Sequence, residues 1–129
     1  MTTTVKKLDQ FDHAQVAKTS MKAFFNICDK WDLNTEEALR LMGEPSRGTF
    51  FKWKRGDATK LTQDQLTRVS IVLGVYKALR LLFPTAEQAH AWINKANTHF
   101  NGKPAREQFC TGNMISMLDL RRYLDAVRG

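Results

Sequence analysis

The sequence is poor in cysteine and proline, and it contains no long apolar run. Its 129 residues include two cysteines and three prolines, and no stretch approaches the ~20 consecutive apolar residues of a membrane-spanning helix. The N-terminal residues lack the apolar segment of a secretory signal. Cys28 and Cys110 form no C-x-x-C pair, so we expect two buried thiols rather than a disulfide scaffold. These absences argue against membrane, secreted and fibrous proteins and predict a soluble, cytoplasmic protein.

The sequence also lacks the signatures of common catalytic and metal sites. It has no H-E-x-x-H motif, no G-x-S-x-G nucleophile elbow and no G-x-x-x-x-G-K-[ST] phosphate loop. His13, His90 and His99 share no metal-ligand spacing with either cysteine. We therefore predict no catalytic residue, no metal ligand and no cofactor, and a protein that binds rather than catalyses.

The net charge of the chain is moderately positive. The chain carries 20 lysines and arginines against 13 aspartates and glutamates, for a formal net charge of +7, and 43% of its residues are hydrophobic. That length and composition fit one globular domain, or two small halves that share a core. A positive balance favours a nucleic-acid partner only where the charge gathers on a binding motif.

Apolar residues recur at helical spacing along the chain, and no run of alternating β-branched residues predicts a strand. The first twelve residues are polar and are expected to fray. We expect helices over about residues 14–31, 35–42, 47–54, 63–83, 86–96, 104–109 and 115–127. The fourth opens with a Thr62–Gln65 capping box, and Gly74 leaves open whether it is one bent helix or two. Trp31, Trp53 and Trp92 each fall in an apolar stripe and are expected in the core. The predicted fold class is all-α.

One segment, residues 35–56, has the pattern of a helix, a tight turn and a second helix. Ala38 is small where the two helices would cross, Gly43 supplies the turn, and Phe50 and Trp53 anchor the second helix at i, i+3 spacing. The remaining polar positions lie outward or at the helix ends, as a recognition helix requires. The candidate DNA-binding residues are Ser46, Arg47, Thr49, Lys52, Lys54 and Arg55.

Charge gathers on the same segment. Between Ser46 and Lys60 there are five basic residues and one acidic residue, a balance of 5 − 1 = +4. An α-helical hairpin with a solvated lysine face would show part of this pattern. The coincidence of turn, cap, tryptophan and charge favours DNA binding.

The segment also resembles the Xre-type helix-turn-helix, and the resemblance continues downstream. Leu61–Phe83, with the segment Ser70–Pro84, is similar to the linker helices of the MbcA/ParS/Xre antitoxin family. Trp92–Asn97 followed by Phe100–Pro104 resembles that family's toxin-binding domain, and Leu118–Gly129 resembles its terminal helix. The resemblance implies a flexible N-terminus (1–13), a helix-turn-helix domain (14–60), and a helical linker with a small helical toxin-binding domain (61–129).

The family resemblance implies an antitoxin that neutralises a partner toxin and represses its own operon. The implied partners are a RES-domain toxin that acts on NAD and operator double-stranded DNA. The chain is expected to form a homodimer and a hetero-oligomer with the toxin. No membrane partner is implied. The terminal helix is expected to abut the active site of the toxin. The candidate toxin-binding residues are Asn97, Arg121, Arg122, Asp125, Val127, Arg128 and Gly129.

A second class of function fits the helix-turn-helix equally well. In this alternative the chain is a stand-alone transcriptional regulator, and its C-terminal half serves dimerisation or effector binding. The two hypotheses differ in whether an adjoining gene encodes a protein that is toxic alone and harmless when this chain is co-expressed.

Overall fold

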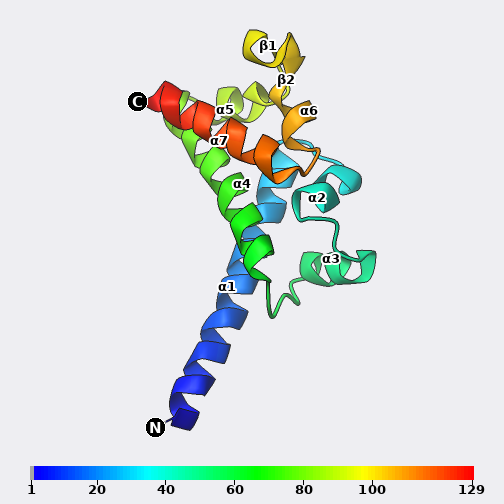
Figure 1. Ribbon diagram of the computed structural model, residues 1–129, viewed down its shortest axis with the longest axis vertical. Coiled ribbons are helices and arrows are strands. Elements are labelled where there is room, and N and C mark those ends of the chain that lie inside the picture. Colours follow the sequence, from blue (N-terminus) through cyan, green and yellow to red (C-terminus); the bar gives the residue numbers. More distant parts are fainter. Residues whose placement is uncertain (1) are drawn as a thin grey trace.

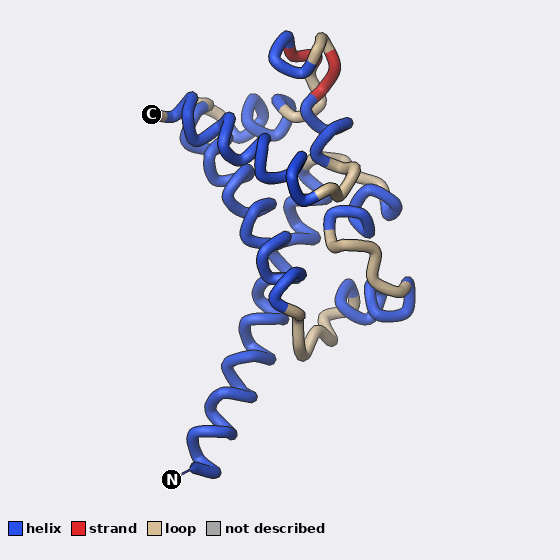
Figure 2. The backbone as a smooth tube through the Cα atoms, viewed as in Figure 1, coloured by secondary structure: helices blue, strands red, loops and turns tan. Residues whose placement is uncertain are grey.

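The computed structural model describes the backbone of residues 2–129 and the side chains of residues 12–129. This part of the chain is mostly helical, with one 3₁₀ turn and a very short two-stranded sheet (Figures 1 and 2). The elements in chain order are α1 Thr2–Lys30, α2 Thr35–Leu41, α3 Arg47–Lys54, α4 Gln63–Leu82, α5 Ala86–Trp92, β1 Ala96–Asn97, η1 Thr98–Phe100, β2 Lys103–Pro104, α6 Ala105–Phe109 and α7 Met114–Arg128. The all-α prediction is confirmed.

Helix α1 begins at Thr2, well before the residue 14 that was predicted. The sequence contains neither glycine nor proline before Gly43, so nothing in it interrupts helical backbone there. The N-terminal half of α1 extends away from the other helices (Figure 1). Met1 and the side chains of residues 2–11, which belong to the predicted flexible segment 1–13, lie outside the described part of the chain.

The predicted capping residues begin their helices. Asn34 caps α2: its side-chain oxygen accepts from the Glu37 amide at 2.9 Å, and Glu37 accepts from the Asn34 amide at 3.0 Å. Thr62 and Gln65 form the same reciprocal pair at the start of α4. Helix α4 then continues unbroken through Gly74, so the fourth predicted helix is a single one.

The core is built around α4, which packs against α1, α5 and α7. Figure 1 shows α7 lying along α4, with α2 and α3 to one side. Trp31 and Val72 are fully buried, and one continuous cluster of buried side chains includes residues from α1 to α7. Cys28 and Cys110 are buried free thiols, as expected. Burial raises the pKa of the Cys110 thiol to about 12 and also raises that of Cys28.

A short hairpin is the element that sequence periodicity missed. Ala96 pairs with Pro104 and Asn97 with Lys103 in an antiparallel ladder. Asn101 and Gly102 turn the chain with φ of 60° and 78°, values that asparagine and glycine tolerate. Two residues per strand are too few for an alternating pattern, so the sequence carried no strand signal.

Trp92 is half-buried rather than a core anchor, and this prediction is wrong. It stacks on Tyr123 at 6.5 Å between ring centroids, whereas the next residue, Ile93, is fully buried. Helix α5 ends at Trp92 rather than continuing to residue 96 as predicted, and Ala96 is exposed. Trp31 and Trp53 are buried as predicted.

Helix α2 is held by three contacts from the second half of the chain. The Arg106 guanidinium of α6 forms an ion pair with Glu37 and donates to the Asp32 carbonyl at 2.9 Å. Arg40 donates to the Cys110 carbonyl at 2.7 Å, and Arg68 of α4 donates to the Leu41 carbonyl at 3.3 Å as well as to the Gly112 carbonyl at 2.7 Å. These contacts join residues that are far apart in the sequence, so α2 belongs to the same packed body as α6 and α7.

Gly112 provides the closest approach in this junction, and its replacement tests the packing. A Cβ at Gly112 would lie 2.1 Å from the Arg40 carbonyl oxygen, at a φ of +76°. We predict that Gly112→Ala destabilises the protein by ~2–4 kcal/mol through left-handed strain and overpacking. Gly48→Ala is the control, because a Cβ there meets nothing within 4 Å, and it should be neutral or stabilise by up to ~1 kcal/mol. The measurement is urea unfolding, and equal stability of the two variants would contradict the described packing.

Candidate functional site

Helix α3 has one face buried in the core. Ser46 caps its start, with the hydroxyl oxygen accepting from the Thr49 amide at 3.2 Å. Phe50 and Trp53 are buried, and the Phe50 ring meets Phe25 of α1 edge-on at 5.2 Å. These contacts fix the rotation of α3 about its axis and therefore decide which residues face outward.

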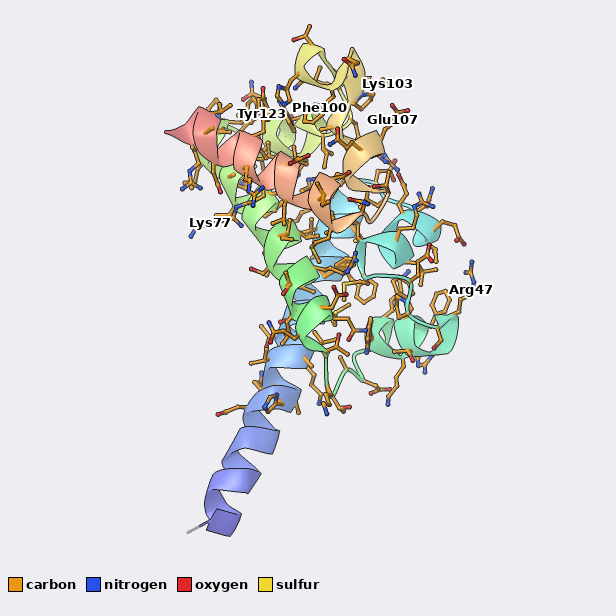
Figure 3. All side chains as sticks on the ribbon, in the orientation of Figure 1. Arg47, Lys77, Phe100, Lys103, Glu107 and Tyr123 are labelled. Atoms are coloured by element: carbon orange, nitrogen blue, oxygen red, sulfur yellow. The ribbon has the colours of Figure 1, made fainter. Side chains whose placement is uncertain are left out.

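The outward face of α3 is basic and open. Arg47, Phe51 and Arg55 lie at i, i+4 and i+8 on this face, with Gly48 and Lys52 between them. All five are exposed. Arg47, labelled in Figure 3, points away from the molecule and forms an ion pair with Glu36 of α2. Such an exposed pair is worth at most about 1 kcal/mol, so the guanidinium can exchange it for another anion.

The predicted DNA-binding residues divide into three groups in the structure. Arg47, Lys52 and Arg55 lie on the outward face, and Lys54 lies on the flank nearer α1. Ser46 and Thr49 are exposed, but their hydroxyls hydrogen-bond each other at 2.9 Å within the cap. Phe51, which is 36% exposed, was not among the predicted residues. Its i+4 spacing from Arg47 was the signal that could have identified it.

In the C-terminal half, an aromatic cluster ties the hairpin to α7. Tyr123 of α7 stacks on His99 at 4.0 Å between ring centroids and meets Phe100 edge-on at 5.7 Å. Trp92 covers Tyr123 from α5. Phe100 and Tyr123 are labelled in Figure 3 near the C-terminal end of α7. The cluster places the hairpin beside the last turns of α7.

Beside this cluster lies a polar cavity of about 350 Å³ between the hairpin and α6. Lys103 and Glu107 line it together with Phe100, and Figure 3 shows all three on this part of the molecule. A cationic and an anionic side chain at one opening suit hydrogen bonding to a polar protein surface.

The predicted toxin-binding residues do not form one uniform surface. Asn97 is half-buried in the hairpin, where its side chain accepts from the His99 amide at 2.9 Å. Arg121 forms an ion pair with Asp125 at 3.0 Å and lies across Gly74, where an added Cβ would be 1.4 Å from a guanidinium nitrogen. Arg121 is therefore used in part to pack α7 on α4. The exposed members are Arg122, Asp125, Val127, Arg128 and Gly129, at the end of α7.

Neither a metal-ion cluster nor a membrane-spanning helix is found among the described residues. The described side chains contain no group of three histidine, cysteine or acidic residues that could hold a metal ion. No helix within residues 2–129 combines the length and apolar character that crossing a bilayer requires.

The sequence α2, turn, α3 and the outward face of α3 define a helix-turn-helix protein. Residues 10–74 match the antitoxin Xre-like helix-turn-helix domain, and residues 78–129 match the antitoxin Xre/MbcA/ParS C-terminal toxin-binding domain. The chain belongs to the Xre/MbcA/ParS antitoxin family. It is similar to the uncharacterised protein y4oB of Sinorhizobium fredii, with 41% identity over 118 residues that cover 92% of this chain and 90% of that protein.

The ion pair of Glu37 with Arg106 joins the two matched segments, and it should make the stability of the fold depend on pH. The Arg106 guanidinium, by its hydrogen bonds to Glu37, lowers the pKa of that carboxyl below its usual value. Glu37 belongs to the helix-turn-helix segment and Arg106 to the toxin-binding segment. Their side chains are only 13% and 24% exposed, so solvent screens this pair less than a surface ion pair.

We predict that Glu37→Gln lowers the free energy of unfolding by an amount that depends on pH. Because the pKa of Glu37 is lower in the folded state than the usual ~4.3, its carboxylate stabilises the fold above that pH. The stabilisation is lost as the pH falls through the lower folded-state pKa. Urea unfolding at a series of pH values should show a wild-type advantage at pH 7 that disappears in acid. Glu44→Gln, at an exposed turn residue, should match the wild type throughout. A wild-type advantage that did not change with pH would rule out this role for Glu37.

Proposed function

We propose that this chain is the antitoxin of a type II toxin–antitoxin pair, that it neutralises a RES-domain toxin acting on NAD, and that it represses its own operon. The observation that carries the proposal is the combination, in one chain, of a helix-turn-helix with a basic outward face and a segment matching a toxin-binding domain. That second match favours an antitoxin over a stand-alone regulator. The family resemblance supports three further parts of the proposal. They are operator DNA as a partner, a toxin of the RES type, and a homodimer of this chain that forms a hetero-oligomer with the toxin.

The geometry of α3 suits the DNA major groove. An α-helix with its side chains is about 10–12 Å in diameter, which fits the ~12 Å width of the major groove, and α3 offers eight residues. Its buried aromatic residues hold it to α1, and Arg47 and Lys52 project from the opposite side. Arginine and lysine are the side chains that most often read guanine there. Lys54 and Arg55, at the helix end, suit phosphate contacts.

The toxin surface that we propose combines the end of α7 with the hairpin. Val127 is 55% exposed although it is apolar, and Arg122, Asp125 and Arg128 of the same helix are exposed as well. A single exposed apolar side chain is common on protein surfaces, so what supports this surface is the match of residues 78–129 to a toxin-binding domain. The Tyr123 cluster adds the hairpin, with Asn97, to the same end of the molecule.

Co-expression tests the antitoxin function directly. The adjoining gene of the operon, expressed alone, should arrest growth and deplete cellular NAD, and this chain should restore both. An adjoining gene product that is harmless, or whose toxicity this chain does not relieve, would contradict the proposal.

The DNA-binding face is tested by the double variant Arg47→Ala/Lys52→Ala. Each good base contact is worth ~1–3 kcal/mol, so the loss of two should lower operator affinity by about thirtyfold or more. Neutralisation of the toxin should persist. The matched control is Lys77→Ala/Arg80→Ala, which removes two exposed cations from α4 and should leave operator affinity nearly unchanged. Full operator affinity in the first variant, with helicity intact by circular dichroism, would mean that α3 does not read the operator.

The terminal residues are tested by deleting Val127–Gly129. All three are exposed, so the melting temperature and operator binding should hardly change. Toxicity of the partner should return, because the deletion removes the tail that the resemblance places against the toxin's active site. A truncated protein that still protects cells and inhibits the purified toxin would assign neutralisation to the body of the domain instead.

A further inference from the structure

A basic groove runs between α1 and the end of α3, and its α1 residues are not among those that the sequence analysis selected. It encloses about 320 Å³, and its floor includes Phe25 and Trp53. Lys18 and Lys22 of α1 line one side, and Lys54 and Arg55 line the other. Lys18 and Lys22 are one turn apart on the same face of α1. Four cations from two helices therefore surround one concave surface.

The groove has the charge of an anion site. None of the residues that line it is an aspartate or a glutamate, and all four cations are exposed. The ion pairs found among the described residues use other arginines, namely Arg47, Arg68, Arg106 and Arg121. Cations at a helix C-terminus can be explained by the helix dipole, which accounts for Lys54 and Arg55. It does not account for Lys18 and Lys22, which lie in the middle of α1.

We propose that this groove binds the phosphate backbone of the DNA whose major groove α3 enters, with Lys18 and Lys22 as its α1 contacts. The inference rests on the DNA-binding part of the proposed function. Arg55 links the two surfaces, since it lies both on the outward face of α3 and on the wall of the groove. The groove is formed by segments that match the helix-turn-helix domain alone, which favours DNA over an acidic face of the toxin.

Salt dependence of binding by Lys18→Ala/Lys22→Ala tests the proposal. The probes are a labelled duplex from the promoter of its own operon and an unrelated duplex of equal length. Each phosphate contact contributes about 0.9 to the slope of log K against log salt, so the slope should become shallower by about 1.8. Affinity for both duplexes should fall by the same factor, tenfold or more at low salt, because phosphate contacts carry no sequence information. Both lysines are exposed in a helix, where alanine is the better helix former, so the variant should fold.

The control variant is again Lys77→Ala/Arg80→Ala, which removes the same charge from exposed positions of α4. Its salt slope should equal that of the wild type. An unchanged slope in Lys18→Ala/Lys22→Ala, with operator binding intact in the wild type, would overturn this inference alone. If that variant instead lost toxin neutralisation, the groove would belong to the toxin interface. A wild-type protein that bound neither duplex would overturn both this inference and the DNA-binding part of the proposed function.

Discussion

The ion pair between the Arg106 guanidinium and the Glu37 carboxylate is the contact on which the arrangement of the helices most depends. It joins α6 to the first turn of α2, and the same guanidinium also reaches the Asp32 carbonyl and the Asn94 side chain. Gly112 lies directly against the carbonyl of Arg40 near the other end of α2. Because α2 leads through the Gly43 turn into α3, the C-terminal half of the chain holds the helix that precedes α3.

Two domains recognised by sequence are thus one packed body. The matched segments meet between residues 74 and 78, within α4, and this helix packs against both α1 and α7. The outward face of α3 and the exposed end of α7 lie on different parts of the molecule (Figure 1). Each partner can therefore be bound without covering the surface proposed for the other, while the shared core fixes the distance between the two surfaces.

The helices and their buried faces could largely be predicted from the sequence, whereas contacts between residues far apart in the chain could not. Helical spacing correctly placed Phe50 and Trp53 inside, because both positions lie within regular helix. The same reasoning failed for Trp92, where the helix ends. The ion pair of Glu37 with Arg106 and the shared groove of Lys18 and Lys54 connect residues that only the tertiary fold brings together. The assignment of individual residues to DNA or toxin stays a prediction.

The most direct test of the account is whether one molecule of this chain binds both partners at the same time. Native mass spectrometry of the purified antitoxin–toxin complex, mixed with a duplex from its promoter, measures this. Two separate surfaces on one rigid body predict a species that contains antitoxin, toxin and DNA together. Release of the toxin on DNA binding, or exclusion of DNA by the bound toxin, would contradict the account.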